Sequence, residues 1–489
     1  MSLPALLDHL RQTAALGQVA GLLQWDQEAA MPPDGAAQRA EQAGAMAAVL
    51  HGRAGDPRIP DWIAGIDRNG LSPADRRNVE EAERSYGHAT KIPARLAQEI
   101  ATTTSHAHRV WAKAREDRDV AAFTPVLAEV LDLKRKKAAC LAGDGVDPYD
   151  ALLDLYEPGA RVADLAPLLE GLRAPLVALR ERIAEKPAPA GLTGHFPAPA
   201  QLSLARDIAA RLGYRFEAGR IDTVVHPFCS GHAGDVRITT RTDEADPLNC
   251  LYSTIHEVGH GLYAQGAPDP FLPAAGAVSM GVHESQSRFW ENQVARSRAF
   301  ADWLFPAMAG AFPGLDLAGP DAFYAAVNRV ETGFIRTEAD EVHYNLHILL
   351  RFELERELIG GTLAVADLGE AWNTRFARDF GRAVPNAALG VLQDVHWSAG
   401  LFGYFPTYSL GNIYAASLER AMRRDLPDFD AMLKVAEVAP VLEWLRERIH
   451  RKGRLLSAPA LVEAATGEAP SAAPLIAYLE RKFGALYGL

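Results

Sequence analysis

The sequence has little cysteine, no long apolar run and no excess of positive charge. Its three cysteines, Cys140, Cys229 and Cys250, are spaced neither as a disulfide framework nor as a cysteine zinc site, so a reducing compartment is expected. No stretch of about 18 apolar residues occurs, and the first ten residues lack the parts of a signal peptide. We therefore expect a cytoplasmic protein that neither spans a membrane nor is secreted.

The charge balance is acidic, with 50 Lys and Arg against 62 Asp and Glu and a formal net charge of −12. Such a balance argues against nucleic-acid binding as the main function. The length of 489 residues and the 48% hydrophobic content allow a sizeable core. The Pro/Ala-rich stretch 186–199 lies between helices of similar character, which favours a loop over a domain boundary. We expect one domain over 1–489, with a helical part about 1–215 and an active-site part about 216–489.

Most of the chain has helical periodicity, with apolar residues three and four positions apart among Ala, Glu, Arg and Lys. A mainly α fold is therefore predicted. The charged run Lys134–Lys137 is expected to be a solvated helix face. The clearest predicted helices cover 36–50, 74–89, 93–115, 120–142, 162–184 and 200–213.

One stretch, 220–242, departs from this pattern. Residues 235–241 alternate β-branched and polar side chains, and the segment 230–234 before them has turn composition. A hairpin or a small three-stranded sheet is expected here. An edge strand of such a sheet can hold an extended chain by backbone hydrogen bonds.

The most informative motif follows this stretch and reads His256-Glu257-Val258-Gly259-His260. On a helix, positions i and i+4 lie on the same side, so the two imidazoles can bind one metal ion. Glu257 can then take a proton from a water molecule at that metal. Gly259 costs about 1 kcal/mol of helix propensity relative to Ala, which suggests that something approaches the backbone closely there.

The sequence context supports a helix at this motif. Asp246 is a suitable N-cap and Pro247 a suitable first-turn residue for the apolar segment that leads to His256. A third ligand must come from elsewhere. The next predicted helix contains residues 283–288, and Glu284 would complete a two-His, one-Glu site with an open position for water. His283 and Glu291 remain alternatives, because neither spacing nor chemistry excludes them.

Several further motifs occur in a fixed order along the chain. Together with the histidine motif they resemble the carboxypeptidase Taq family of metallocarboxypeptidases over nearly the whole length. The motifs are Leu23-x-Trp25-Asp26-Gln27, His226-Pro227-Phe228, Asp235-x-Arg237-x-Thr239, His283-Glu284-Ser285-Gln286, Ile335-Arg336-x-x-Ala339-Asp340, Gly390-x-x-Gln393-Asp394-x-His396-Trp397 and Tyr404-Phe405-Pro406-Thr407-Tyr408-x-Leu410-Gly411.

The resemblance implies a mostly helical, homodimeric, cytoplasmic enzyme with a long substrate groove. It further implies removal of residues one at a time from peptide C-termini, with broad specificity that disfavours a C-terminal proline. The implied cofactor is zinc, for which cobalt can substitute. By the same resemblance His256, His260 and Glu284 would bind the metal, and Glu257 would be the general base.

An exopeptidase must also recognise a free carboxylate, and the planar fork of arginine can bond both oxygens. Arg336 is the candidate, with a structural salt bridge to Glu338, Asp340 or Glu341 as the alternative. Tyr408 could donate to the same carboxylate, or it could serve only in packing.

His396 is a candidate donor to the oxyanion, since Asp394 or Trp397 could orient it, and a core histidine is the alternative. The remaining motif residues have open roles. His226 could contact substrate or tie the sheet together, and Arg237 could bind substrate carboxylate or pair with Asp235. Asp340 could orient a ligating histidine. Trp25 and Trp397 are expected in the core.

Overall fold

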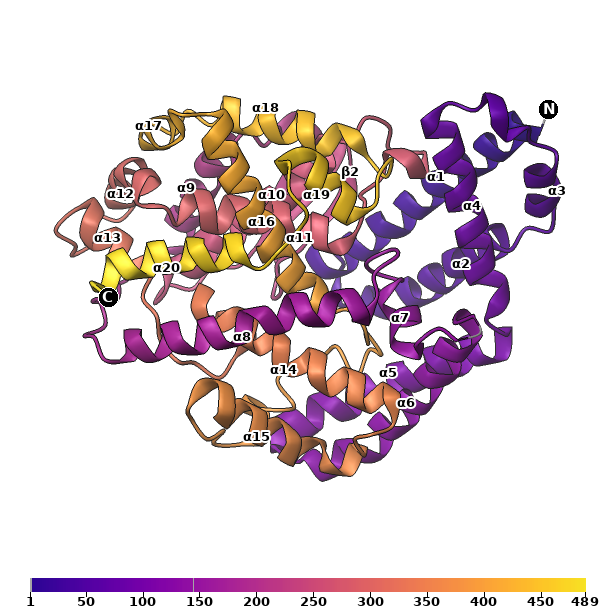
Figure 1. Cartoon of the computed structure of the whole chain (residues 1–489), viewed down its shortest axis with the longest axis horizontal. Coiled ribbons are helices and arrows are strands. Elements are labelled where there is room, and N and C mark those ends of the chain that lie inside the picture. Colours follow the sequence, from indigo (N-terminus) through magenta and orange to yellow (C-terminus); the bar gives the residue numbers. More distant parts are fainter. Residues whose placement is uncertain (1, 144) are drawn as a thin grey trace.

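The computed structural model describes residues 2–143 and 145–489, and helices dominate the chain from end to end (Figure 1). The first part contains α1 Ser2–Ala29, α2 Ala36–Ala54, α3 Arg58–Ala64, α4 Pro73–Lys91, α5 Ala94–Asp117, α6 Val120–Leu141, α7 Pro148–Leu153, α8 Val162–Ala184 and α9 Ala198–Arg211. The strands β1 Gly219–Thr223, β2 Cys229–His232 and β3 Asp235–Thr240 follow.

The second part is again helical. It contains α10 Pro247–Gln265, α11 Met280–Arg288, the π-helix η5 Phe289–Ala295, α12 Arg298–Ala311, α13 Pro320–Val327, the 3-10 turn η6 Arg336–Glu338, α14 Glu341–Gly360, α15 Leu368–Phe380, α16 Pro406–Asp425, α17 Phe429–Lys434, α18 Ala439–Arg448, α19 Ala458–Thr466 and α20 Ala473–Tyr487.

The predicted mainly α fold with a small sheet is confirmed. Each of the six helices expected from periodicity has a counterpart within a few residues of the expected ends. The prediction for Lys134–Lys137 was wrong in part, because the Lys134 side chain is buried in α6 and only Lys136 is exposed. Arg135 also turns inward, and its guanidinium donates to the Leu358 carbonyl of α14.

The small sheet has the order β1-β3-β2. The first and last strands in sequence, β1 and β3, pair in parallel, with Ile221 opposite Ile238. Antiparallel pairing joins β2 to β3, with Cys229 opposite Ile238. Within this sheet β2 is therefore an edge strand. The side chains of Val236 and Ile238 on β3 are fully buried, and β3 packs against α10. The sheet therefore supports the helix that carries the histidine motif.

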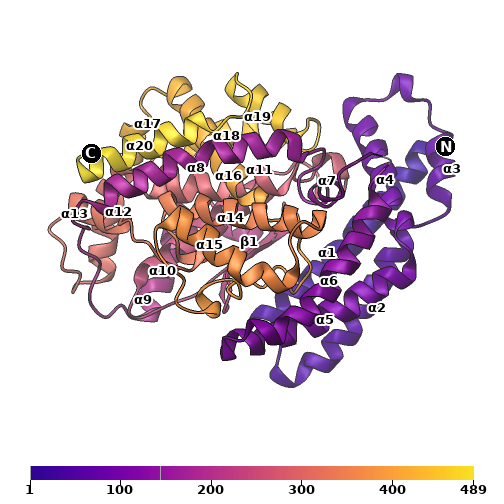
Figure 2. The same cartoon turned by 60° about the horizontal axis from the view of Figure 1, so that its bottom comes forward.

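Two apolar clusters stabilise the molecule. Helices α1 to α4 lie at one end, away from the C-terminus (Figures 1 and 2), where α1, α3 and α4 enclose a small cluster of Leu6, Ile59, Val79 and Ala82. A much larger cluster extends through the rest of the described chain. Helices α14 and α16 are buried on nearly all sides within it, so their polar side chains need partners inside the protein.

Glu355 of α14 illustrates how such a group is accommodated. Its carboxylate accepts hydrogen bonds from the Tyr149 hydroxyl, the Trp397 indole N–H and the Gly403 amide, at 2.7, 2.9 and 2.9 Å. Trp397 is buried, as expected, and so is Trp25. The segment that carries His396 is thereby tied to the core.

Two expectations from the sequence concern the cysteines and the membrane. The three cysteines are free thiols. Among the helices in the described part of the chain, none combines the length and the apolar character needed to cross a bilayer.

Candidate metal centre and substrate site

The histidine motif lies on α10, which begins as the sequence predicts. The Asp246 side chain accepts a hydrogen bond from the Leu248 amide at 3.0 Å, and Pro247 occupies the first turn. These two features satisfy the start of the helix. His256 and His260 then lie one turn apart on the face that meets α11.

A close helix contact explains Gly259. A Cβ atom at this position would lie 2.5 Å from the Ser287 Cα and 2.6 Å from the Gln286 carbonyl oxygen, so only glycine lets α10 and α11 approach this far. Gly411 of α16 does the same on the other side of α11, where a Cβ would overlap the Glu284 side chain. Helix α11 is therefore held between two glycine contacts.

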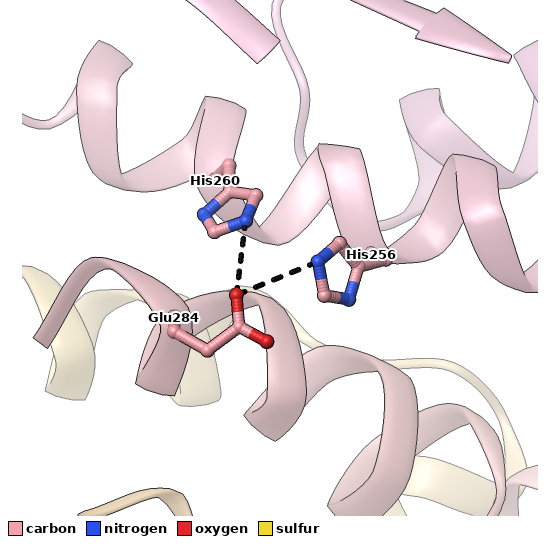
Figure 3. Close-up of side chains that lie close together, drawn as sticks. All are labelled: His256, His260 and Glu284. Carbon is pink, nitrogen blue, oxygen red and sulfur yellow. Dashed lines mark ion pairs between the residues drawn. The ribbon is translucent and has the colours of Figure 1, made fainter. Parts of the chain in front are cut away.

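His256, His260 and Glu284 converge at one point between α10 and α11 (Figure 3). Glu284 Oε2 lies 3.7 Å from His256 Nε2 and 3.5 Å from His260 Nε2. Tetrahedral zinc with bonds of about 2.0–2.1 Å separates its ligand atoms by about 3.3 Å. The donor types suit a divalent metal of this kind, and the two separations are close to those of such a site.

Each histidine is oriented through its second ring nitrogen. His256 Nδ1 lies 2.9 Å from Glu291 Oε2, and His260 Nδ1 lies 3.1 Å from the His283 carbonyl oxygen and 2.6 Å from His283 Nδ1. Such contacts fix the imidazole ring and leave Nε2 free for a metal. Glu291 and His283, the two alternatives for the third ligand, therefore contact the histidines from behind, whereas Glu284 shares their Nε2 side.

Arg288 and Glu291 form a network of ion pairs around the point where His256, His260 and Glu284 converge. Arg288 donates to Glu284 Oε1 at 2.7 Å and to Glu291 Oε2 at 3.2 Å. Burial opposes ionisation of Glu291, but Arg288 and His256 outweigh it and lower the pKa of Glu291 to about 2. Burial likewise disfavours the charged form of Glu284, and the same two residues with His260 overcome it and hold the pKa well below its usual range.

The variant Glu291→Gln tests the orienting contact. We expect affinity for zinc to fall by about 10–100-fold, because the partner of His256 loses its charge. Competition with a chelator of known affinity measures this change. Glu370→Gln, an exposed carboxylate on α15, is the matched control and should bind zinc as the parent does. Equal affinity of Glu291→Gln and the parent would contradict the orienting role.

Glu257 lies beside the three convergent residues. Its side chain is buried, and in the described part of the chain Oε2 has no hydrogen-bond partner. Burial raises the pKa of Glu257, and the neighbouring His256 and His260 oppose the rise. An unengaged carboxylate with a raised pKa suits a group that accepts and returns a proton.

A second cluster forms around Asp394. One carboxylate oxygen accepts from Arg336 Nε at 3.0 Å and the other from Arg351 Nε at 2.7 Å. The partner of Arg336 is therefore Asp394, and the expected alternative partners Glu338, Asp340 and Glu341 were wrong. Two buried guanidiniums share one carboxylate, so the cluster retains an uncompensated positive charge.

His396 and Tyr408 complete this cluster. His396 Nε2 lies 3.2 Å from the Tyr408 hydroxyl, while its Nδ1 is 3.9 Å from Asp394, too far for a hydrogen bond. The expectation that Asp394 or Trp397 orients this histidine was wrong, since Tyr408 is its partner. Burial, reinforced by the positive charge of Arg336, lowers the pKa of His396 to about 3. The imidazole is therefore neutral at physiological pH.

A short chain of contacts joins the two clusters. The Arg288 guanidinium, bonded to Glu284, lies 4.2 Å from the centre of the Tyr344 ring, and the Tyr344 hydroxyl accepts from Arg336 at 3.3 Å. Neither Arg288 nor Tyr344 was predicted as a site residue from the sequence. The spacing of Arg288 four residues after Glu284 on one helix was the available signal.

Comparison with known proteins shows which family contains this chain. The family model described as carboxypeptidase Taq (M32) metallopeptidase matches residues 5–483. The chain belongs to this M32 family. It is therefore a metal-dependent carboxypeptidase, a hydrolase that acts on peptides.

Relatives of the M32 chain support this over its whole length. It is 44% identical to thermostable carboxypeptidase 1 of Thermus thermophilus, covering 99% of this chain and 98% of the relative. Carboxypeptidase 1 of Bacillus subtilis is 35% identical, with 98% and 97% covered. The crystal structure of the M32 carboxypeptidase from Deinococcus radiodurans superimposes with a TM-score of 0.96 at 38% identity, with 100% of both chains covered.

Three residues of the M32 motifs do not join either cluster by hydrogen bonds or ion pairs in the described residues. His226 is exposed in the loop between β1 and β2. Arg237 pairs with Asp235 at 2.9 Å, and its guanidinium stacks 4.2 Å from the centre of the Trp25 ring. Asp340 contacts His343 at 2.8 Å rather than His256 or His260, so the expectation that it orients a candidate ligand was wrong.

A buried glutamate supports the helix that carries the candidate ligand of the M32 site. Glu157 Oε2 accepts the Gly281 amide at 3.0 Å, and the Met280 amide donates to the Tyr156 carbonyl at 2.9 Å. These bonds satisfy amides at the start of α11. Burial raises the pKa of Glu157 from 4.5 to about 7, so its carboxyl group is half protonated near neutrality.

This raised pKa gives the M32 protein a stability that depends on pH. The folded state keeps a proton on Glu157 that the unfolded state has released, so the free energy of unfolding should fall between pH 4.5 and about 7. The fall amounts to at most about 3 kcal/mol. In Glu157→Gln this component should disappear. Urea unfolding at several pH values, with a chelator present, measures it, and parallel curves for variant and parent would contradict the assignment.

Proposed function

We propose that the protein is a zinc-dependent carboxypeptidase of broad specificity, in which cobalt can replace zinc. The observation that supports this most directly is the convergence of His256, His260 and Glu284 beside the unengaged carboxylate of Glu257. Two nitrogen donors and one oxygen donor with an open fourth position are typical of catalytic zinc. A bound zinc ion would supply Lewis acidity to water and to the peptide carbonyl.

Glu257 carries the proton in this proposal. Its free Oε2 accepts a proton from the attacking water and later returns it to the departing amine. Its raised pKa brings the carboxyl closer to the pH at which it must both take and give a proton. Glu291 and Arg288 do not touch the reacting atoms in this scheme, and they hold His256 and Glu284 in position.

Arg336 and Tyr408 would receive the terminal carboxylate of the substrate. The uncompensated charge of the Asp394 cluster favours an anion there, and both side chains carry donors suited to a carboxylate. His396, held neutral by burial, would donate one N–H to the developing oxyanion. Roles for His226 and Arg237 in substrate binding rest on the motif resemblance alone.

The edge strand β2 supports a peptide as substrate, because its outer side is free of strand partners in the described sheet and can pair with an extended chain. A cytoplasmic location, a long groove and a homodimer are further parts of the proposal that follow from the resemblance. A single domain over 1–489 is also proposed, because the stretch 186–199 is interpreted as a loop. Equilibrium sedimentation of the purified protein tests the dimer.

One pair of peptides tests the function. The protein loaded with zinc is incubated with a peptide as free acid and with the same peptide amidated at the C-terminus, and products are followed by mass. We expect stepwise loss of C-terminal residues from the free acid and at least about 100-fold slower hydrolysis of the amide, because an ion pair to Arg336 is lost. Internal cleavage of both forms would indicate an endopeptidase instead. No cleavage with zinc or cobalt bound would leave a peptide-binding scaffold.

A further inference from the structure

The imidazole of His396 makes few polar contacts of its own. Its Nε2 lies 3.2 Å from the Tyr408 hydroxyl, and its Nδ1 is buried without a hydrogen-bond partner among the described residues. The ring also packs against Phe405, with ring centres 4.4 Å apart. A donor to an oxyanion needs a position fixed to within about 0.5 Å. The position of His396 therefore depends on how the backbone on either side of it is held.

Helix α14 holds that backbone from both sides. Its residues Arg351 and Glu355 are fully buried. Arg351 donates at 2.7 Å to Asp394, which precedes His396 by two residues. Glu355 accepts at 2.9 Å from the indole N–H of Trp397, which follows His396 directly. Side chains four positions apart lie on the same face of a helix, so one face of α14 fixes the chain before and after the histidine.

Glu355 also holds the chain further on. Its second oxygen, Oε2, accepts a hydrogen bond from the Gly403 amide at 2.9 Å. Gly403 has a φ of 86°, and a Cβ atom there would lie 2.8 Å from the Leu152 carbonyl carbon, so the backbone at this point contacts α7 directly. One carboxylate thus bridges the two ends of the loop 397–403, which begins immediately after His396.

The donors around Glu355 require two acceptor oxygens. Trp397 and Gly403 present N–H groups that donate and cannot accept, and each meets a different oxygen of the carboxylate. An amide at position 355 offers one oxygen and one NH2 group, so in either orientation the NH2 faces one of these two N–H groups. A buried donor without an acceptor is unfavourable. The third donor, the Tyr149 hydroxyl, can instead reverse its bond and accept.

We propose that Glu355 is a positioning residue, which does not touch the substrate and holds His396 where it donates to the oxyanion. The proposal rests on the proposed carboxypeptidase function and on the role of His396 within it. Glu355 acts through the loop 397–403. Arg336, which would receive the terminal carboxylate, is bonded to Asp394 and not to this loop. Loss of the Glu355 contacts therefore affects the transition state more than binding of the peptide.

The variant Glu355→Gln tests this role in the enzyme loaded with zinc. We expect kcat for a free-acid peptide to fall by about tenfold and KM to stay within about twofold, with zinc content unchanged. Tyr149→Phe is the matched control, because it removes a buried hydrogen bond from the same carboxylate and leaves both acceptors for the loop in place. Its kcat should stay within about twofold of the parent. An equal loss of kcat in both variants would overturn the positioning role.

A double-mutant cycle with His396→Ala connects the effect to the histidine. Without the imidazole, Glu355→Gln has no donor to displace, so its tenfold effect on kcat should shrink to less than about twofold. A full tenfold loss in the His396→Ala background would overturn the proposal, because Glu355 would then act on something else.

The outcomes separate this inference from the proposed function. If the parent shortens no free-acid peptide, or if His396→Ala keeps the parental kcat, the proposed function or its oxyanion donor fails, and the positioning role fails with it. If His396→Ala loses turnover and Glu355→Gln does not, only the positioning role is overturned. Should Glu355→Gln fail to fold, Trp397→Phe removes the indole N–H from the same contact. It should lower kcat with the same dependence on His396, and an unchanged kcat would overturn the proposal.

Discussion

Replacing Glu257 with glutamine should lower kcat for C-terminal hydrolysis by about 10²–10⁴-fold while zinc content stays unchanged. The amide has the size of the carboxylate and can still accept a hydrogen bond from water, but it cannot take the proton. The loss should appear in kcat more than in KM, because ground-state binding of the peptide does not depend on this proton transfer.

The same experiment needs zinc content measured on each preparation. Glu257 lies between the two candidate ligands in sequence, so a disturbed helix could mimic a chemical effect. Glu370→Gln provides a control for handling and for loss of a surface charge. Turnover by Glu257→Gln close to that of the parent, with zinc bound, would rule out Glu257 as the general base.

Glu284→Gln should be the most damaging change for metal binding. The neutral amide removes the negative charge that faces both histidine Nε2 atoms, at 3.5 and 3.7 Å, and it leaves buried Arg288 with only Glu291 as an anionic partner. We expect zinc affinity to fall by about 100-fold or more, beyond the loss in Glu291→Gln. Chelator competition measures both variants under the same conditions.

The order of the two effects distinguishes the roles of the two glutamates. If Glu291→Gln weakened zinc binding more than Glu284→Gln, the third ligand would be Glu291, and the geometry around Nε2 would need another explanation. Activity at saturating zinc separates affinity from chemistry. Glu284→Gln should remain impaired there, whereas Glu291→Gln should recover most of its turnover, because His256 can still bind when zinc is in excess.

The helical fold and the start of α10 were predictable because they depend on local patterns. Apolar spacing identifies α6 and α8, and the N-cap Asp246 with Pro247 marks the start of α10. The burial of Lys134 was not predictable in this way. A charged run indicates a solvated face only when no other element covers it, and the segment around Gly400 packs against Lys134 from elsewhere in the chain.

The candidate site was predictable where its residues share a short motif. His256, Glu257 and His260 follow from helical spacing, and the resemblance favoured Glu284. The long-range pairs were not predictable. Asp394 joins Arg336 and Arg351 only because the loop after α15 packs on α14, and nothing in the sequence near Arg336 indicates that partner. Glu291 reaches His256 from a π-helix, a local widening that periodicity does not indicate.

The two glycines that flank α11 determine more than how closely the helices pack. Because Gly259 lets α10 contact the α11 backbone and Gly411 makes room for the Glu284 side chain, the positions of the three donor atoms depend on how α10, α11 and α16 pack. The distances between the donor atoms are thus set by helix packing. We therefore expect ions that bind two nitrogens and one oxygen at tetrahedral spacing to replace one another in this site, and larger ions that prefer several oxygen ligands to bind more weakly. The metal used in the cell would then be decided by supply among the ions that fit.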